Sequence, residues 1–326
     1  MRGIVTLGML FALWAVAPVS AAGAREEHRL LVNGVERWTT VYLPASYRPG
    51  APVVLLLHGG TQSMRKILSE KSGGTRHWLT IAEREKFLLL IPNATNAETG
   101  DPKGDHQNWN DLRPAGITGK AAADDVGFLL HLLDWVQERY GTDPQKIFVT
   151  GASNGGMMTF RLLIEQPRRF AAAAAFIASL PAGVPAKPAH TTRVPLMLFN
   201  GTRDPLIQWN GGEIRGERGM TLAIEPMVAW WREVNGVDRA TALTSTLPDR
   251  DSKDGCQIQR TEWPGVANGS ARVVFYSAEG GGHALPSIAH PLKHGPVVRR
   301  LIGPVCRDAE GAELAWEFFK PYTRTP

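Results

Sequence analysis

The sequence predicts an α/β fold, a mostly parallel, doubly wound sheet between two layers of helices. Short apolar runs such as residues 53–57 and 87–91 lack polar alternation, which is typical of strands covered on both faces. Segments with helical periodicity alternate with these runs along the chain, as in doubly wound folds. Near the start, Asn33 and Gly34 separate two strand-like segments, and this pair favours a tight hairpin. We therefore expect an N-terminal antiparallel hairpin at one edge of the sheet.

The elements follow in chain order. Strands are predicted at residues 28–32, 37–43, 53–57, 87–91, 146–150, 172–177, 194–200 and 272–277, and helices at 78–85, 121–140, 157–165, 221–235 and 309–319. In the helix predicted at 121–140, apolar residues recur every three or four positions, and Asp124 and Asp125 lie in its first turn, where carboxylates favour the helix dipole. No repeat, low-complexity tract or Ser/Pro-rich linker divides the chain, so we predict a single domain at residues 25–326.

Residues 1–24 have the layout of a secretory signal peptide. Arg2 precedes an apolar run over residues 4–19, and small residues follow at 20–24. The alternative is a membrane anchor, but the apolar run is shorter than the ~20 residues that a spanning helix needs. We expect a secreted or periplasmic protein without a stable membrane span.

The composition is that of an ordinary globular protein, with 43% hydrophobic and 21% charged residues. The formal charge of +5 includes Arg2, and the other basic residues are scattered except for Arg299 and Arg300. This pattern gives no support to a nucleic-acid partner. The nine histidines are dispersed and no Cys-x-x-Cys or His-Glu-x-x-His spacing occurs, so we predict no metal site.

Cys256 and Cys306 are the two cysteines of the chain. In an oxidising compartment such a pair is expected to form one disulfide. The loop that it closes contains His283, so we expect the bond to pin the segment that presents this histidine.

A Gly-x-Ser-x-Gly motif lies at residues 151–155, with Ser153 at its centre. The motif joins a predicted strand to a predicted helix, which is the context of a nucleophile elbow. There a strained turn, permitted by the flanking glycines, lifts the serine hydroxyl above the sheet edge. We predict that Ser153 is a nucleophile; the alternative is a structural serine in a tight turn.

A serine hydroxyl needs a base, and in this arrangement an acidic residue and then a histidine should follow it along the chain. Asp204 directly follows the strand predicted at 194–200, where its carboxylate could fix the tautomer of an imidazole. The alternative is an aspartate that caps a turn before Pro205. The rivals Asp238 and Asp254 lie in turn-rich polar contexts without a preceding strand.

His283 is the predicted base. It follows the strand at 272–277 and three glycines at 280–282, which let the backbone turn tightly enough to bring the ring over the serine. His290 and His294 lie in a Pro- and Gly-rich loop, and His131 lies on a predicted helix, so all three fit this role less well.

The oxyanion of a tetrahedral intermediate needs two donors. We expect one to be the N–H of Asn154, the residue after the nucleophile. The other should come from the loop after the strand at 53–57, where Gly60 is the first choice and Thr61 the second. We interpret His58 as a structural brace of this loop in preference to a second base.

With these residues in place, the chain resembles the polyhydroxybutyrate depolymerase and feruloyl esterase family of α/β-hydrolases. The shared motifs run from about residue 42 to the final helix: residues 58–62, 108–110, 124–128, 151–158, 201–204, 281–283 and 316–319. The resemblance implies an α/β-hydrolase fold, a triad of Ser153, Asp204 and His283, and hydrolysis of carboxylic esters through an acyl-enzyme without metal or organic cofactor. It also implies that Trp109 lines the acyl or alcohol pocket, with a place in the core as the alternative.

The chain departs from this family near the predicted cleft. Where the family often has Thr-Trp-Pro-Gly after the histidine, residues 284–287 read Ala-Leu-Pro-Ser, so Leu285 replaces an aromatic wall of the substrate site. Residues 288–307 look like an insertion stapled by Cys306. We expect no separate binding domain after the catalytic part, and therefore soluble esters or oligomers in preference to solid polymer.

The sequence thus predicts an exported esterase for hydroxyalkanoate oligomers, feruloyl or acetyl esters, or related aryl and short acyl esters. The alternatives are a serine peptidase that uses the same triad and a non-catalytic binding protein on a hydrolase scaffold.

Overall fold

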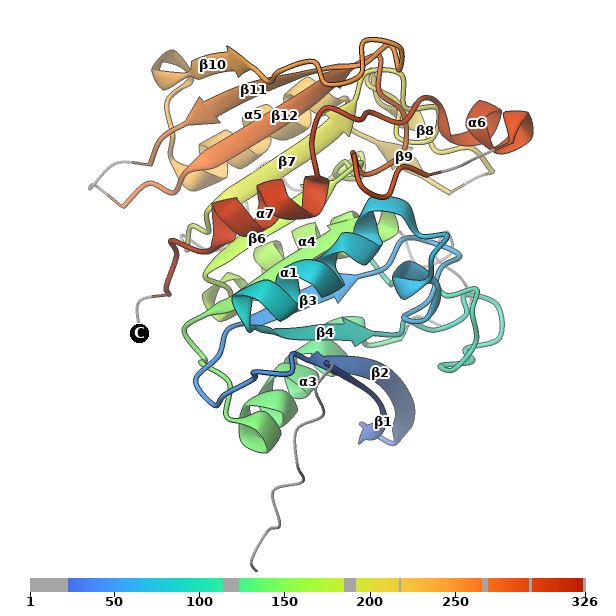
Figure 1. Ribbon diagram of the computed structural model, residues 1–326, viewed down its shortest axis with the longest axis vertical. Helices are drawn as coiled ribbons and strands as arrows, with labels where there is room; N and C mark the ends of the chain where they lie inside the picture. Colours follow the sequence, from blue (N-terminus) through green and yellow to red (C-terminus); the bar gives the residue numbers. More distant parts are fainter. Residues whose placement is uncertain are drawn as a thin grey trace, which may run out of the picture.

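The computed structural model of the chain describes residues 23–113, 123–184, 192–216, 218–265, 269–292 and 295–324 (Figure 1). Residues 1–22 of the predicted signal peptide, and the first two residues of the helix predicted at 121–140, lie outside the described residues. No helix in the described ranges is long and apolar enough to cross a membrane.

One large sheet dominates the described part of the chain. Its ten strands lie in the order β1-β2-β4-β3-β5-β6-β7-β12-β11-β10. The central strands are β3 (Val53–Leu57), β4 (Leu88–Pro92), β5 (Ile147–Ala152), β6 (Ala172–Phe176), β7 (Leu196–Gly201) and β12 (Val273–Glu279). Each pairs in parallel with its neighbours in this group, which confirms the predicted α/β-hydrolase architecture.

The N-terminal edge is the predicted hairpin. Strands β1 (Ala24–Val32) and β2 (Val35–Leu43) pair antiparallel, and Val32 faces Val35 across a two-residue turn. Asn33 and Gly34 both have positive φ, of 51° and 78°, as the tight turns of the primed type require.

The other edge of the sheet is also antiparallel, whereas the sequence predicted antiparallel strands at one edge only. Strands β11 (Gln257–Trp263) and β10 (Leu243–Thr246) follow β12 there. All four residues of β10 are exposed, so it carries no apolar pattern that could have been recognised. Strands β8 (Gly212–Glu213) and β9 (Met220–Thr221) form a separate short hairpin that was likewise not predicted.

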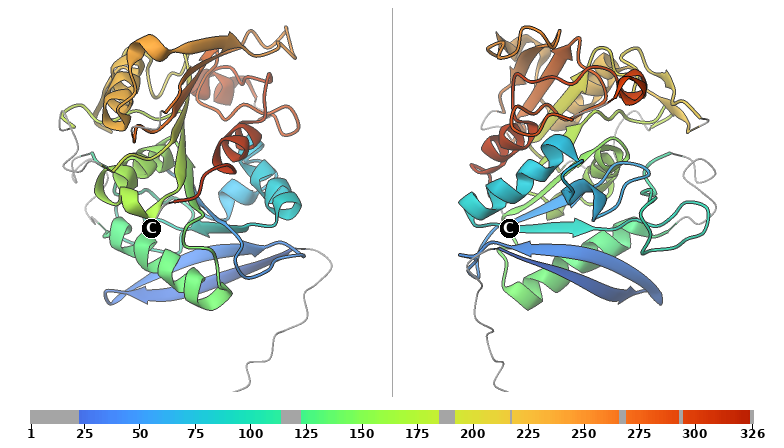
Figure 2. Two further views of the ribbon diagram at one scale, coloured as in Figure 1. Left: turned by 90° about the vertical axis from the view of Figure 1, so that its left-hand side faces the viewer. Right: turned by 45° about the vertical axis from the view of Figure 1, so that its right-hand side comes forward.

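Helices cover both faces of the sheet, as the left-hand panel of Figure 2 shows. One layer contains α3 (Asp125–Tyr140), α4 (Asn154–Glu165) and α5 (Ile224–Asn235), and the other α1 (His77–Glu85) and α7 (Gly311–Phe319). Each layer buries its own apolar cluster against the sheet. Further short helices are η1 (Lys66–Leu68), η2 (Gly73–Arg76), η3 (Pro167–Arg169), η4 (Arg239–Thr241) and α6 (Pro296–Ile302).

The helices start at positions that caps and neighbours determine. Helix α3 begins at Asp125, later than predicted, because Asp124 is its N-cap and accepts a hydrogen bond from the Gly127 N–H at 2.8 Å. Helix α4 begins at Asn154, directly after Ser153 and earlier than predicted. Helix α6 was not predicted, and none of its residues is buried.

The parallel strands place the predicted site residues together. Because the carboxyl ends of β3, β5, β7 and β12 meet at one edge of the sheet, on the right in Figure 1, the segments that follow them share that edge. These segments carry Gly60, Ser153, Asp204 and His283 in that order.

Candidate active site

Ser153 occupies a strained turn between β5 and α4. Its φ of 56° and ψ of −123° lie outside the regions that L-residues ordinarily adopt, at a cost of about 1–3 kcal/mol that the surroundings must offset. Its N–H donates to the carbonyl of Phe176 at 2.9 Å. Glycine is required beside it, because a Cβ on Gly155 would lie 2.4 Å from the carbonyl oxygen of Leu57. The strand, strained serine and helix have the geometry that a nucleophile elbow requires.

Asp204 and His283 form a buried pair. Oδ2 of Asp204 lies 2.7 Å from Nδ1 of His283, and the two side chains are 0% and 9% exposed. The other oxygen, Oδ1, accepts hydrogen bonds from the N–H groups of Leu206 and Ile207 at 2.8 and 2.9 Å. An ionised carboxylate only accepts, so Nδ1–H donates to it and Nε2 of the histidine remains available to accept a proton.

Backbone hydrogen bonds hold the histidine loop against the segment that precedes Cys306. The N–H of His283 donates to the carbonyl of Ile302 at 2.5 Å, and the N–H of Gly282 donates to that of Pro304 at 2.8 Å. A disulfide joins Cys256 to Cys306, with Cα atoms 5.4 Å apart. The predicted disulfide is thus confirmed, and it ties the segment that supports His283 to the start of β11.

The loop after β3 lies against the serine turn. A Cβ on Gly59 would lie 3.7 Å from Cβ of Ser153, and one on Gly60 would lie 3.5 Å from Cβ of Asn154. The N–H of Thr61 donates to the carbonyl of Gln107 at 2.9 Å. The Gly60 N–H has no acceptor among the described residues. Of the two residues predicted to donate from this loop, Gly60 is therefore the one whose N–H is available.

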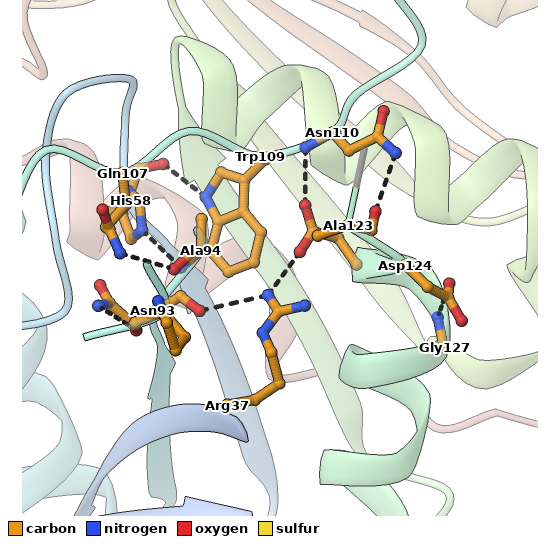
Figure 3. Close-up of polar contacts among 12 residues, drawn as sticks. Arg37, His58, Asn93, Ala94, Gln107, Trp109, Asn110, Ala123, Asp124 and Gly127 are labelled. Atoms are coloured by element: carbon orange, nitrogen blue, oxygen red, sulfur yellow. Dashed lines mark hydrogen bonds and ion pairs between the residues drawn. The ribbon is translucent and has the colours of Figure 1, made fainter. Parts of the chain in front are cut away.

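His58 joins this loop to the segment after β4 through both ring nitrogens; Figure 3 shows its contact with Ala94. Its Nε2 accepts from the N–H of Ala94 at 3.1 Å, so Nδ1 carries the proton and donates to the carbonyl of Gly59 at 2.8 Å. Burial lowers the pKa of His58 from 6.5 to about 4, because an imidazolium without solvent is unfavourable. Both ring nitrogens are thus occupied, which fits the bracing role and not that of a second base.

Trp109 and Leu285, the two residues predicted to line the substrate pocket, are both buried. Trp109 is 0% exposed, and its indole N–H donates to the carbonyl of His58 at 2.9 Å. Leu285 belongs to the apolar cluster between the sheet and α7. Trp109 therefore has the place in the core that the sequence left open as the alternative, where its indole supports the β3 loop, and Leu285 packs inward.

Asp111 and Arg113 lie next to the predicted site and were not identified from the sequence. Their side chains are 0% and 8% exposed and form an ion pair with a distance of 2.7 Å. Oδ2 of Asp111 also accepts from Nδ2 of Asn154 at 2.7 Å. The pair directly follows the motif at residues 108–110, but its contact with a residue 43 positions further on could not be read from spacing.

The rival candidates lie in other settings. Asp238 caps η4, and Asp254 accepts from the backbone N–H groups of Cys256 and Arg307. His131 is exposed on α3, and the ring of His290 is tilted against that of His77 with centroids 5.8 Å apart. His294 lies outside the described residues.

The segment predicted as an insertion, residues 288–307, contains α6 and several exposed apolar side chains. Val297 is 74% exposed and Leu301 46%. Together with Asp251 and Asp254 the segment lines a cavity of about 580 Å³. Its carbonyls at Ile302 and Pro304 hold the histidine loop, so the insertion is part of the support of the site.

Comparisons with known proteins relate this chain to hydrolases. Residues 104–180, which include Ser153, match the Prolyl oligopeptidase family. An acetylxylan esterase from Coprinopsis cinerea is 25% identical, over 83% of this chain and 71% of its own length. Poly(3-hydroxyalkanoate) depolymerase C from Paucimonas lemoignei is 25% identical, over 75% of this chain and 58% of its own length.

The fold has a counterpart among solved structures. An acetyl xylan esterase from Aspergillus awamori superimposes with a TM-score of 0.56 at 18% identity, over 85% of this chain and 98% of that one. The resemblance predicted from the motifs is thereby confirmed: the chain has the α/β-hydrolase fold and is similar to carboxylic ester hydrolases of the serine type.

Proposed function

We propose that this chain is an exported serine esterase in which Ser153 is the nucleophile, His283 the general base and Asp204 the residue that orients the base. The observation that carries the proposal is the buried 2.7 Å contact between Asp204 and His283, at the sheet edge where the strained turn exposes Ser153. A binding protein on this scaffold would have no need of either feature.

In the proposed acylation, a named residue performs each step. Oγ of Ser153 attacks the carbonyl carbon of the ester while Nε2 of His283 takes its proton, and Asp204 stabilises the imidazolium that forms. The N–H groups of Asn154 and Gly60 donate to the oxyanion of the tetrahedral intermediate; one such donor is typically worth about 10²- to 10³-fold in kcat. His283 returns the proton to the departing alkoxide, which leaves an acyl group on the serine.

Deacylation repeats these steps with water. Nε2 of His283 takes a proton from a water molecule that attacks the acyl carbon. When the second tetrahedral intermediate collapses, His283 returns this proton to the departing Oγ of Ser153, which releases a carboxylic acid and restores the serine hydroxyl.

The substrates we propose are esters of hydroxyalkanoate oligomers, acetyl or feruloyl esters, and related short acyl or aryl esters. Support comes from relatives that are named acetylxylan esterase, poly(3-hydroxyalkanoate) depolymerase and feruloyl esterase. The proposal of export has two supports: the signal-peptide layout of residues 1–24 and the disulfide between Cys256 and Cys306, since such bonds persist in oxidising compartments.

The test is a hydrolysis panel of 4-nitrophenyl acyl esters, methyl ferulate, acetylated xylan and 3-hydroxybutyrate oligomers, with Ser153→Ala beside the parent protein. We expect turnover of at least one class by the parent and a loss of about 10⁴-fold or more in Ser153→Ala, the order found when a triad serine is removed. Full activity in a folded Ser153→Ala protein would contradict the mechanism.

A serine peptidase is the second candidate, and one observation favours it: the match of residues 104–180 to the Prolyl oligopeptidase family. The same triad cleaves amides in other folds. Peptidyl 4-nitroanilides assayed on the same preparation separate the two, because an esterase should turn over the esters far faster than the anilides.

A further inference from the structure

We propose that Asp111, with Arg113 as its counter-ion, is a positioning residue that fixes the oxyanion donor Asn154. The inference rests on the proposed esterase function and assigns a role to a buried ion pair outside the triad.

The side chain of Asn154 is fully used to anchor its own backbone. Its Oδ1 accepts from the N–H of Trp109 at 2.7 Å, and its Nδ2 donates to the carbonyl of Trp109 at 3.1 Å and to Oδ2 of Asp111 at 2.7 Å. Asn154 is the first residue of α4, where the backbone N–H has no acceptor within the helix. The three side-chain bonds therefore clamp the residue whose free N–H is the proposed oxyanion donor.

The carboxylate of Asp111 is itself fixed by hydrogen bonds from Arg113. Its Oδ1 accepts from the backbone N–H of Arg113 at 2.9 Å, and Nε and Nη2 of the guanidinium reach its oxygens at 3.0 and 2.7 Å. With the bond from Asn154, both oxygens of this fully buried carboxylate are saturated. A buried carboxylate held by an arginine fork offers a strong, directional acceptor to the Asn154 amide, and with side chains 0% and 8% exposed the two residues do not form a surface ion pair.

Residues 109–111 also support Gly60, the second proposed oxyanion donor. The indole of Trp109 donates to the carbonyl of His58, which braces the loop of Gly60 (Figure 3). A Cβ on Gly60 would lie 3.5 Å from Cβ of Asn154, so the two donors are neighbours. Residues 109–111 thus form the shared support that sets the distance between them.

A third contact fixes the segment from the far side. Nη1 of Arg113 donates to the carbonyl of Arg218 at 2.7 Å, which lies in the turn between β8 and β9. The guanidinium therefore joins the support of the oxyanion hole to the hairpin beside it through hydrogen bonds from Nε, Nη1 and Nη2.

Loss of the carboxylate should act on the transition state and not on substrate binding. A displacement of about 1 Å in a catalytic group can cost 10²-fold in rate, whereas the ester in its ground state makes weaker demands on the oxyanion donors. We expect Asp111→Ala to lower kcat by about 10- to 100-fold with KM within about threefold. Asp111→Asn should lose less, because its amide oxygen can still accept from Nδ2 of Asn154.

The experiment compares Asp111→Asn, Asp111→Ala, Asn154→Ala and the double variant Asp111→Ala/Asn154→Ala on 4-nitrophenyl butyrate. Rates are referred to active sites titrated with a fluorophosphonate, so that unfolded protein does not count. The inhibition constant of n-butylboronic acid is measured in parallel, because its tetrahedral adduct with Ser153 places an oxygen in the oxyanion hole. We expect this constant to rise by the same factor by which kcat/KM falls, and the double variant to lose no more than the worse single variant.

Phe319→Leu is the matched control for a loss of stability alone. Phe319 is fully buried, stacks on Phe148 and lies in the cluster on the other side of the sheet. Phe319→Leu should lower the melting temperature and leave kcat and boronate binding per active site unchanged.

Two results would overturn the inference. One is a kcat within twofold of the parent in folded Asp111→Ala, or in Asn154→Ala if Asp111→Ala does not fold; the other is a fall in kcat with no change in boronate affinity. If either result is found while Ser153→Ala is inactive, only the role of Asp111 is contradicted. An active Ser153→Ala would remove the esterase mechanism itself.

Discussion

The carboxylate of Asp204 meets the imidazole of His283 at 2.7 Å although 79 residues separate them along the chain. Strands β7 and β12 pair in parallel as neighbours, so the two loops that follow them start side by side. The segment between the two residues supplies helix α5 and the antiparallel edge of the sheet. The pair is thus a product of strand order, and its geometry leads to the first prediction.

Asp204→Asn should lower kcat by about 10³- to 10⁴-fold and leave KM nearly unchanged. An amide can donate to Nδ1 and so favours the tautomer whose Nε2 already carries a proton and cannot act as the base. Steady-state kinetics on 4-nitrophenyl butyrate at pH 7.5 measure the effect.

Asp238→Asn is the control for that substitution. Asp238 is exposed and caps η4 by accepting from the Ala240 N–H, so its variant should keep the activity of the parent. Equal activity of the two variants would exclude Asp204 from the triad.

Removal of the disulfide should weaken both stability and catalysis. A loop of 50 residues corresponds to about 4 kcal/mol in the chain-entropy model, and the bond supports the carbonyls that hold the His283 loop. Cys256→Ser/Cys306→Ser should therefore unfold at lower urea concentration and show a reduced kcat. The parent treated with dithiothreitol should approach this variant, and the variant itself should not respond; an untouched kcat in both would contradict the pinning role.

His58 should make the protein sensitive to mild acid. Its pKa is about 4 in the folded chain against 6.5 without burial, so the unfolded chain takes up the proton first as the pH falls. The stabilisation is fully present above pH 6.5 and is lost as the pH falls toward 4, by about 3 kcal/mol. Urea unfolding across this range measures the loss.

His58→Gln should lack that component of the pH dependence, since glutamine does not titrate. His131→Gln is the control, because His131 is exposed on α3 and its variant should follow the parent. A His58→Gln profile that is parallel to the parent's would contradict the assignment.

Breaking the buried ion pair of Arg37 and Asp125 should lower the free energy of unfolding far more than breaking an exposed ion pair. Nη2 of Arg37 contacts Oδ1 of Asp125 at 2.5 Å, with side chains 3% and 0% exposed. Arg37→Met leaves the buried carboxylate unpaired and should cost about 3–5 kcal/mol of unfolding free energy. Glu36→Gln, which breaks the exposed pair with Arg29, should cost at most about 1 kcal/mol. Chemical denaturation of both variants compares them.

Much of the fold could be predicted because its signals are local. The continuous apolar runs at β3, β4, β5, β6 and β7 identify buried parallel strands, and Asn33 with Gly34 identifies the first hairpin. The edge strand β10 could not be predicted, since its four residues are all exposed and show no apolar alternation. Strand β11 buries only Ile258 and Trp263, a pattern too sparse to identify a strand. The order of Ser153, Asp204 and His283 after their strands was likewise readable, because each role demands a residue type at the end of a strand.

By itself the sequence determined which residues carry the proposed chemistry and that two cysteines form a disulfide. Only the tertiary structure decided what surrounds them: that Trp109 is core, that the N–H of Thr61 is already bonded to Gln107, and that Asp111 and Arg113 hold Asn154. Such contacts join residues from separate loops, and their distances depend on packing that no spacing along the chain encodes. A motif indicates which chemistry a residue type can perform, whereas the tertiary contacts of that residue determine whether its donors and acceptors are available for it.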